Sequence, residues 1–215
     1  MKKNSSTFLE ELLKRYPQLL ICREQLILAV ESLITCYSEG GKLLVCGNGG
    51  SASDAAHIVG ELMKSFLLKR PVENDFREKL LKVAPDSAMQ IADNLQRALP
   101  AIALTQENAL LSAYANDVSP ELVYAQQVFG YGREKDVLLC ISTSGNSSNI
   151  IKAAVVGKAK GLCTISLTGS NTSALTRICD ISVQVPESEP YKVQELHLPL
   201  YHCLCAILEQ EFFGT

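Results

Sequence analysis

The sequence predicts an α/β fold in which one parallel sheet lies between two layers of helices. Short apolar segments alternate along the chain with longer segments of helical spacing, which is the pattern of repeated strand–helix units. The apolar segment at 137–142 shows no alternation with polar residues, as expected for a strand that helices cover on both faces. With 215 residues, of which 47% are hydrophobic, the chain can form one domain with a substantial core.

An N-terminal helical arm is expected over residues 6–39, because apolar side chains recur there with helical spacing. Pro17 should break or kink this arm, since proline lacks the amide proton that a helix interior needs. Gly40 and Gly41 end the arm, and the first strand follows at 42–46.

The middle of the chain contains a charged, helix-prone insertion at about 72–99. A helix at 53–68 precedes it, and a turn at 85–87 supplies a cap for a helix from 88 to 98. After Pro100, the sequence predicts strands at 101–104, 137–142, 163–167 and 181–185, and helices at 108–115, 119–130, 149–160 and 192–212.

Two loops rich in glycine, serine and asparagine follow the first and third strands, at 47–53 and 142–149. Right-handed crossovers place the loops after parallel strands at one edge of the sheet, where ligands bind in such folds. Glycines let the backbone turn sharply, and a helix that begins there offers free amides to a phosphate. The loops are therefore predicted to converge on a phosphorylated ligand. Neither loop has the spacing of a nucleotide-binding motif, which disfavours nucleotides.

Few side chains could carry acid–base or metal chemistry beside these loops. His57 and Glu61 are spaced to lie on one face of a helix. Gln194 and His202 lie within about 80° of each other around the final helix. Taken singly, a histidine is more often a structural residue, and Asn116-Asp117 is more often a helix cap.

Composition excludes several classes of function. A net charge of −3 gives no electrostatic footprint for nucleic acid or an anionic membrane. No apolar run reaches the roughly 18 residues of a membrane span. The eight cysteines lie mostly in apolar runs and no secretory signal precedes them, so reduced thiols and a cytoplasmic location are expected.

Read together, these motifs resemble the phosphoheptose isomerases of the SIS (sugar isomerase) domain superfamily. The resemblance covers about 40–70 and 100–213, and is carried by Gly47-Asn48-Gly49-Gly50-Ser51, His57-x3-Glu61, Ala115-Asn116-Asp117, Ile141-Ser142-Thr143-Ser144-Gly145-Asn146-Ser147 and Gln194-x7-His202. It implies a single SIS domain over 1–215, with a three-layer sandwich around a five-stranded parallel sheet of doubly wound, flavodoxin-like type. It also implies a homotetramer with active sites at subunit interfaces.

The resemblance further implies isomerisation of sedoheptulose 7-phosphate to D-glycero-D-manno-heptose 7-phosphate through an enediol. Glu61 and His202 match the acid–base positions, and a carboxylate with an imidazole suits this proton transfer. One Zn²⁺ per subunit would be held by His57, Glu61, Gln194 and His202 and would polarise the carbonyl, which leaves open whether Glu61 is base, ligand or both. The positions that match the substrate site are Asn48, Gly49, Gly50, Ser51, Asn116, Asp117, Ser142, Thr143, Ser144, Ser147 and Gln194.

The insertion at 72–99 departs from the compact members of this family and leaves the exact sugar open. It could form a lid, a pocket wall, an interface or a solvated decoration. One alternative function is a non-catalytic phosphosugar-binding regulator, of the type that docks a replication initiator. Another is an isomerase of a different phosphosugar, or a related activity of the superfamily such as an etherase.

Overall fold

A computed structural model describes residues 5–214 and contains a five-stranded sheet in the order β2-β1-β3-β4-β5. Every neighbouring pair of strands is parallel, which confirms the predicted doubly wound, flavodoxin-like sheet. The two central strands are buried throughout, as their unbroken apolar sequences predict. The strands are β1 (Leu43–Cys46), β2 (Ala101–Ala103), β3 (Val137–Ile141), β4 (Cys163–Thr168) and β5 (Ile181–Gln184).

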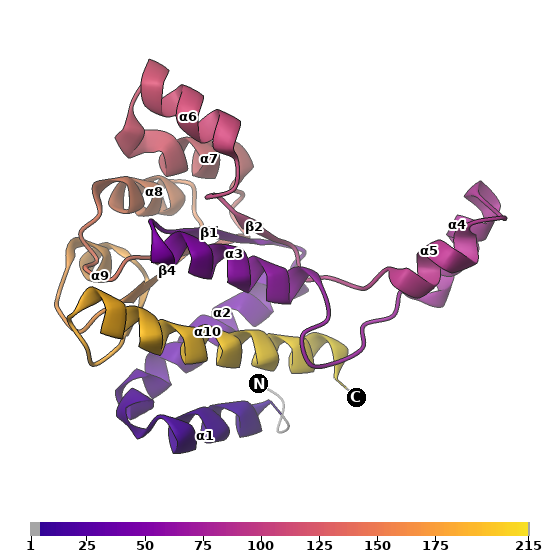
Figure 1. Cartoon of the computed structure of the whole chain (residues 1–215), viewed down its shortest axis with the longest axis horizontal. Coiled ribbons are helices and arrows are strands. Elements are labelled where there is room, and N and C mark those ends of the chain that lie inside the picture. The colour runs from indigo at the N-terminus through magenta and orange to yellow at the C-terminus, as the bar shows by residue number, and fades with distance from the viewer. Residues whose placement is uncertain (1–4, 215) are drawn as a thin grey trace.

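Helices cover both faces of the sheet and give three layers (Figure 1). Along β1, Leu43 and Val45 face the larger core, whereas Leu44 and Cys46 face the smaller one. The larger core includes α1 (Ser6–Arg15), the 3₁₀ helix η1 (Pro17–Cys22), α2 (Arg23–Ser38), α3 (Gly50–Met63) and α10 (Pro190–Phe213). The opposite side carries α6 (Asn108–Asp117), η2 (Pro120–Leu122), α7 (Val123–Tyr131), α8 (Ser148–Ala159) and α9 (Ala174–Ile178).

Several element boundaries differ from those expected. The N-terminal arm breaks at Pro17 as predicted, but the break opens a 3₁₀ helix rather than a kinked α-helix. The helix α3 begins at Gly50 and ends at Met63, five residues before the predicted end at 68. Sequence analysis missed the short helix α9, which begins with a capping box between Ser173 and Thr176.

The insertion at 72–99 forms a helical hairpin of α4 (Asn74–Val83) and α5 (Ala88–Asn94). Only Ala88 and Ala92 are buried within these two helices, and an ion pair of 2.7 Å joins Arg77 Nη1 to Asp93 Oδ1. Figure 1 shows the hairpin projecting beyond the C-terminal end of α3, away from the polar loop at the start of that helix. In residues 5–214, no helix has both the length and the apolar character needed to cross a membrane.

Candidate functional site

The two polar loops converge at the carboxyl edge of the sheet, as predicted. They follow β1 and β3, which are neighbours, and Cys46 pairs with Cys140 at the ends of these strands. The side-chain amides of Asn48 and Asn149 exchange two hydrogen bonds, of 2.9 and 3.0 Å. The loops are therefore fastened to each other across their tips.

The loop at 142–149 has the features that suit an anion. The Ser142 and Ser147 hydroxyl oxygens lie 3.2 Å apart, and Ser147 immediately precedes the twelve-residue helix α8. Gly145 has a φ of +65°, and a Cβ at this position would come within 2.0 Å of the Ser173 hydroxyl. Ser144 is exposed and Thr143 half-buried beside them. Hydroxyl groups and the free amides of a helix N-terminus together form a phosphate site.

The loop at 47–50 connects β1 to α3 and packs closely against the Gln194 side chain. Gly49 has a φ of +55°, and a Cβ on Gly50 would meet the Gln194 side-chain nitrogen at 2.4 Å. The Gln194 amide of α10 therefore lies directly against the backbone of this loop. Ser51 is 3% exposed and its N–H donates to the Asn48 carbonyl at 3.0 Å, so Ser51 shapes the loop from beneath.

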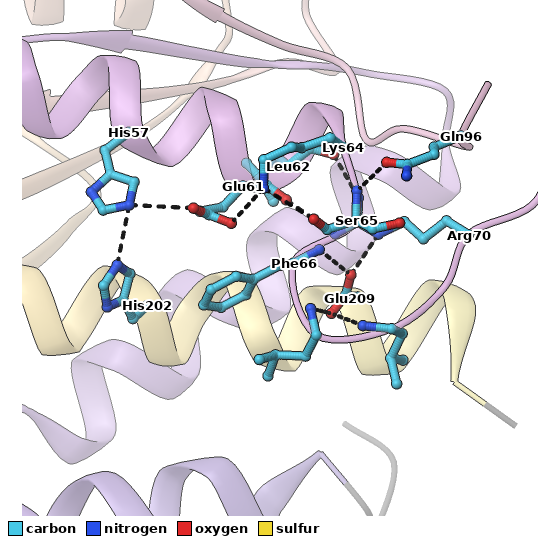
Figure 2. A network of polar contacts seen from close by, with 12 residues as sticks. His57, Glu61, Leu62, Lys64, Ser65, Phe66, Arg70, Gln96, His202 and Glu209 are labelled. Atoms are coloured by element: carbon cyan, nitrogen blue, oxygen red, sulfur yellow. Dashed lines mark hydrogen bonds and ion pairs between the residues drawn. The ribbon is translucent and has the colours of Figure 1, made fainter. Parts of the chain in front are cut away.

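A cluster of titratable side chains from α3 and α10 lies further along α3, about two to three helical turns after the loop at 47–50 (Figure 2). The His57 Nε2 atom is 3.3 Å from Glu61 Oε1 and 3.4 Å from His202 Nε2. Lys64 Nζ lies 3.4 Å from the other oxygen of Glu61, whose side chain is 13% exposed. Both predicted acid–base residues thus lie around the His57 imidazole.

Burial and neighbouring charge shift the pKa of one member of this cluster, His202. Burial, together with the charge of His57, lowers the pKa of His202, while Glu61 opposes this shift. His202 is therefore neutral at neutral pH and can both donate and accept a proton. The third histidine, His197, is fully buried, and burial lowers its pKa to about 4, which identifies it as a neutral structural residue.

Two residues that sequence reasoning missed, Tyr201 and Asp54, form a hydrogen-bonded chain to the His57 ring. The Tyr201 hydroxyl oxygen lies 3.0 Å from His57 Nδ1 and donates to Asp54 Oδ1 at 3.3 Å. Burial raises the pKa of Asp54, although its hydrogen bond from Tyr201 opposes the shift. Asp54 precedes His57 by three residues on α3, so the same helix-face argument could have found it.

Asn116 and Asp117 lie apart from this cluster in the described part of the chain. They end α6, both are exposed, and the Asn116 amide donates to Asp117 Oδ1 at 2.8 Å. This arrangement keeps both polar side chains available to a ligand. Their assignment to the sugar site remains a prediction.

Two distances between donor atoms of the cluster suit a zinc ion. Zn–N and Zn–O bonds of about 2.0–2.1 Å place neighbouring tetrahedral donors about 3.3 Å apart. The two distances from His57 Nε2, to Glu61 and His202, match that spacing. Residues 5–214 nevertheless contain no preassembled group of three or more His, Cys, Asp or Glu side chains around a metal position. The residue types suit zinc, but these side chains do not surround a common metal position in the described residues.

Comparisons with known proteins show the family of this chain. A model of the SIS domain family matches residues 8–79 and 87–169. The phosphoheptose isomerase of Aneurinibacillus thermoaerophilus is 35% identical over 198 residues, covering 90% of this chain and 87% of that protein. That of Burkholderia pseudomallei strain K96243 is 36% identical over 184 residues, covering 86% and 80%.

Solved structures give the same result in three dimensions. The phosphoheptose isomerase from Francisella tularensis superposes with a TM-score of 0.75 at 30% identity, covering 95% of this chain and 96% of that one. The phosphoheptose isomerase from Neisseria gonorrhoeae superposes with a TM-score of 0.71 at 30% identity, covering 96% and 94%.

Proposed function

The chain belongs to the phosphoheptose isomerase family of SIS domain proteins, and we propose that it interconverts sedoheptulose 7-phosphate and D-glycero-D-manno-heptose 7-phosphate. The observation that carries this proposal is the approach of Glu61 and His202 to the His57 imidazole, on the helix that follows the polar loop at 47–50. A sensor of phosphosugars would need the loop but not this carboxylate–imidazole cluster.

Ketose–aldose exchange moves one hydrogen from C1 to C2 of the sugar and one proton from O1 to O2. Glu61 takes the proton from C1, and the electron pair of that C–H bond becomes the C1–C2 double bond of the enediol. The carbonyl oxygen O2 gains a proton from neutral His202. His202 then takes the proton of O1 as the new carbonyl forms, and Glu61 returns its proton to C2, which closes the balance.

Phosphate binding is assigned to the hydroxyls of Ser142, Thr143, Ser144 and Ser147 and to the amides that begin α8. The sugar chain is assigned to Asn48, Gly49, Gly50, Gln194, Asn116 and Asp117, with Ser51 supporting the loop from beneath. A turnover experiment tests the whole assignment: sedoheptulose 7-phosphate is followed by NMR, with fructose 6-phosphate as the comparison sugar. Formation of the manno-heptose 7-phosphate is expected, and turnover of fructose 6-phosphate alone would contradict the choice of substrate.

Replacement of Gly145 by alanine is expected to weaken sugar phosphate binding by at least about tenfold. The φ of +65° is strained for any residue with a Cβ, by about 1–2 kcal/mol, and the added atom would collide with Ser173. Calorimetric titration with sedoheptulose 7-phosphate measures the effect. Gly130→Ala is the matched control, because a Cβ there meets nothing within 4 Å. Equal affinity in both variants would contradict the assignment of the phosphate loop.

Zinc binding is proposed for His57, Glu61, Gln194 and His202, with one ion per subunit. The spacing of donors around His57 Nε2 supports it, and a bound ion would polarise the sugar carbonyl. The two oxygens of Glu61 face different neighbours, His57 and Lys64, so one oxygen can bind a metal while the other serves as base.

Removal of zinc is expected to lower turnover of sedoheptulose 7-phosphate, and one equivalent of Zn²⁺ per chain should restore it. Metal content by mass spectrometry and initial rates are measured on the same chelator-treated samples. His57→Ala is expected to lose the bound zinc. Full activity at less than about one zinc per ten chains would contradict a role for zinc in the reaction.

A homotetramer and a cytoplasmic location are also proposed. Exposed apolar side chains on the projecting hairpin, including Phe76, Val83 and Met89, favour burial against another chain. Light scattering should then give about four times the chain mass of 23.4 kDa, and a mass near 23.4 kDa would contradict assembly.

The cysteines support the proposed cytoplasmic location. All eight are free thiols, which suits a reducing compartment, and fractionation of the native host cells tests that location.

A further inference from the structure

Tyr201 lies between two residues of α3 and contacts both through one hydroxyl group. Its oxygen is 3.0 Å from His57 Nδ1 and 3.3 Å from Asp54 Oδ1. The tyrosine is 3% exposed, and its ring meets the His57 ring edge to face with centroids 5.4 Å apart. Asp54 Oδ2 is buried and has no hydrogen-bond partner in residues 5–214. The half-buried Asp54 carboxylate therefore accepts a hydrogen bond from Tyr201 through one oxygen and leaves the other without a donor in the described residues.

The number of available protons fixes the direction of these hydrogen bonds. A hydroxyl carries one proton, and an ionised carboxylate can only accept. Tyr201 therefore donates to Asp54, which leaves a lone pair of the hydroxyl oxygen facing His57 Nδ1. His57 must then carry its proton on Nδ1 and donate it to Tyr201. In the neutral imidazole, which carries a single ring proton, the Nε2 atom of His57 is then left without a proton.

The unprotonated Nε2 atom faces Glu61 and His202, the two proposed acid–base residues. It lies 3.3 Å from Glu61 Oε1 and 3.4 Å from His202 Nε2. Two lone pairs, on His57 and Glu61, then point at each other and favour a cation between them. In the other tautomer, Nε2–H would donate to Glu61, which would occupy the carboxylate and leave Nε2 unable to bind a metal.

We propose that Tyr201, oriented by Asp54, is a positioning residue that holds His57 in its Nδ1–H tautomer and so keeps Nε2 free as a metal ligand. The inference rests on the proposed role of His57 in zinc binding. Tyr201 acts through His57 rather than on the sugar itself. It also prevents His57 from taking up the Glu61 carboxylate as a hydrogen-bond acceptor.

Nitrogen-15 NMR of the metal-free protein tests the tautomer directly. The chain has three histidines, so a histidine-labelled sample gives few signals, and His57→Gln identifies those of His57. At a pH at which the imidazole is neutral, the wild-type spectrum should show a protonated Nδ1 and an unprotonated Nε2 for His57. Tyr201→Phe keeps the ring but removes the hydroxyl, and should move the proton to Nε2. Asp54→Leu should do the same, because Tyr201 is then free to donate to Nδ1.

Tyr37→Phe is the matched control. It likewise removes a buried tyrosine hydroxyl, but the Tyr37 hydroxyl has no hydrogen-bond partner among the described residues. This variant should keep the wild-type tautomer of His57. A protonated Nε2 in the wild type, or an unchanged tautomer in Tyr201→Phe, would overturn the proposal. These spectra need neither metal nor substrate, so they are independent of whether the isomerase assignment holds.

Zinc affinity supplies the second measurement, by competition with a chromophoric chelator. Tyr201→Phe should bind Zn²⁺ roughly 10- to 100-fold more weakly than wild type, whereas Tyr37→Phe should bind it equally well. At limiting zinc, kcat for sedoheptulose 7-phosphate should fall in Tyr201→Phe while KM stays near the wild-type value, and excess zinc should restore kcat. Unchanged zinc affinity in Tyr201→Phe would overturn the positioning role.

Discussion

Replacing Glu61 with glutamine is expected to lower kcat for sedoheptulose 7-phosphate by about 10²- to 10⁴-fold, the usual contribution of a general base. The amide has nearly the same shape as the carboxylate but cannot accept the proton from C1. Because the phosphate loop is formed by other residues, the dissociation constant of the sugar phosphate should stay close to that of the wild type. Steady-state rates and calorimetric titration on the same preparation measure the two quantities.

Glu10→Gln makes the same chemical change at an exposed position of α1 and should leave both quantities unchanged. Zinc content of Glu61→Gln must be measured as well, because Glu61 is also a proposed ligand. Loss of turnover with zinc retained assigns the base role. Wild-type turnover in Glu61→Gln would sink that role, and a wild type that binds the sugar without turnover would favour the regulatory alternative.

Replacing Arg70 with alanine is expected to lower the free energy of unfolding by about 3–5 kcal/mol, since it breaks a buried ion pair. Arg70 and Glu209 are both almost fully buried, and Arg70 Nε donates to Glu209 Oε1 at 2.7 Å. The same guanidinium donates to the carbonyls of Glu61 and Leu62 at the end of α3 (Figure 2). The substitution should therefore also loosen the helix turn that carries Glu61.

Urea unfolding followed by circular dichroism measures this loss, since the chain has no tryptophan for fluorescence. Lys79→Ala removes a partner from an exposed pair with Asp75, and should cost less than about 1 kcal/mol. Arg70→Met combined with Glu209→Leu should recover part of the stability, because it leaves no unpaired buried charge. A cost for Arg70→Ala no larger than that for Lys79→Ala would show that the buried pair does not hold this region together.

The sheet and the meeting of the two loops could be predicted because both follow from local patterns. Uniform apolar segments identify buried strands, and crossover handedness places the loops after β1 and β3 at one edge. The hydrogen bonds between Asn48 and Asn149 confirm that prediction at atomic distance. The i, i+4 spacing likewise placed His57 and Glu61 together.

The end of α3 could not be predicted, because its cause lies far away in the sequence. The backbone N–H groups of Phe66, Leu67 and Leu68 donate to the Glu209 carboxylate. Because these amides bond to Glu209, they do not bond to the carbonyls of the preceding helical turn, and α3 ends at Met63. A single sequence gives no signal for a hydrogen bond to a residue about 140 positions later. The contacts of Tyr201 with Asp54 and His57 could not be predicted for the same reason, because these residues lie more than 140 positions apart in the sequence.

The central claim is that Glu61 removes the proton from C1 of the sugar. Deuterium exchange tests it most directly: sedoheptulose 7-phosphate is incubated with the enzyme in D₂O, and the C1 proton signals are followed by NMR. The wild type and Glu10→Gln should incorporate deuterium at C1 at equal rates, and Glu61→Gln should incorporate essentially none. Exchange at C1 by Glu61→Gln at the wild-type rate would contradict the account, because another group would then be the base.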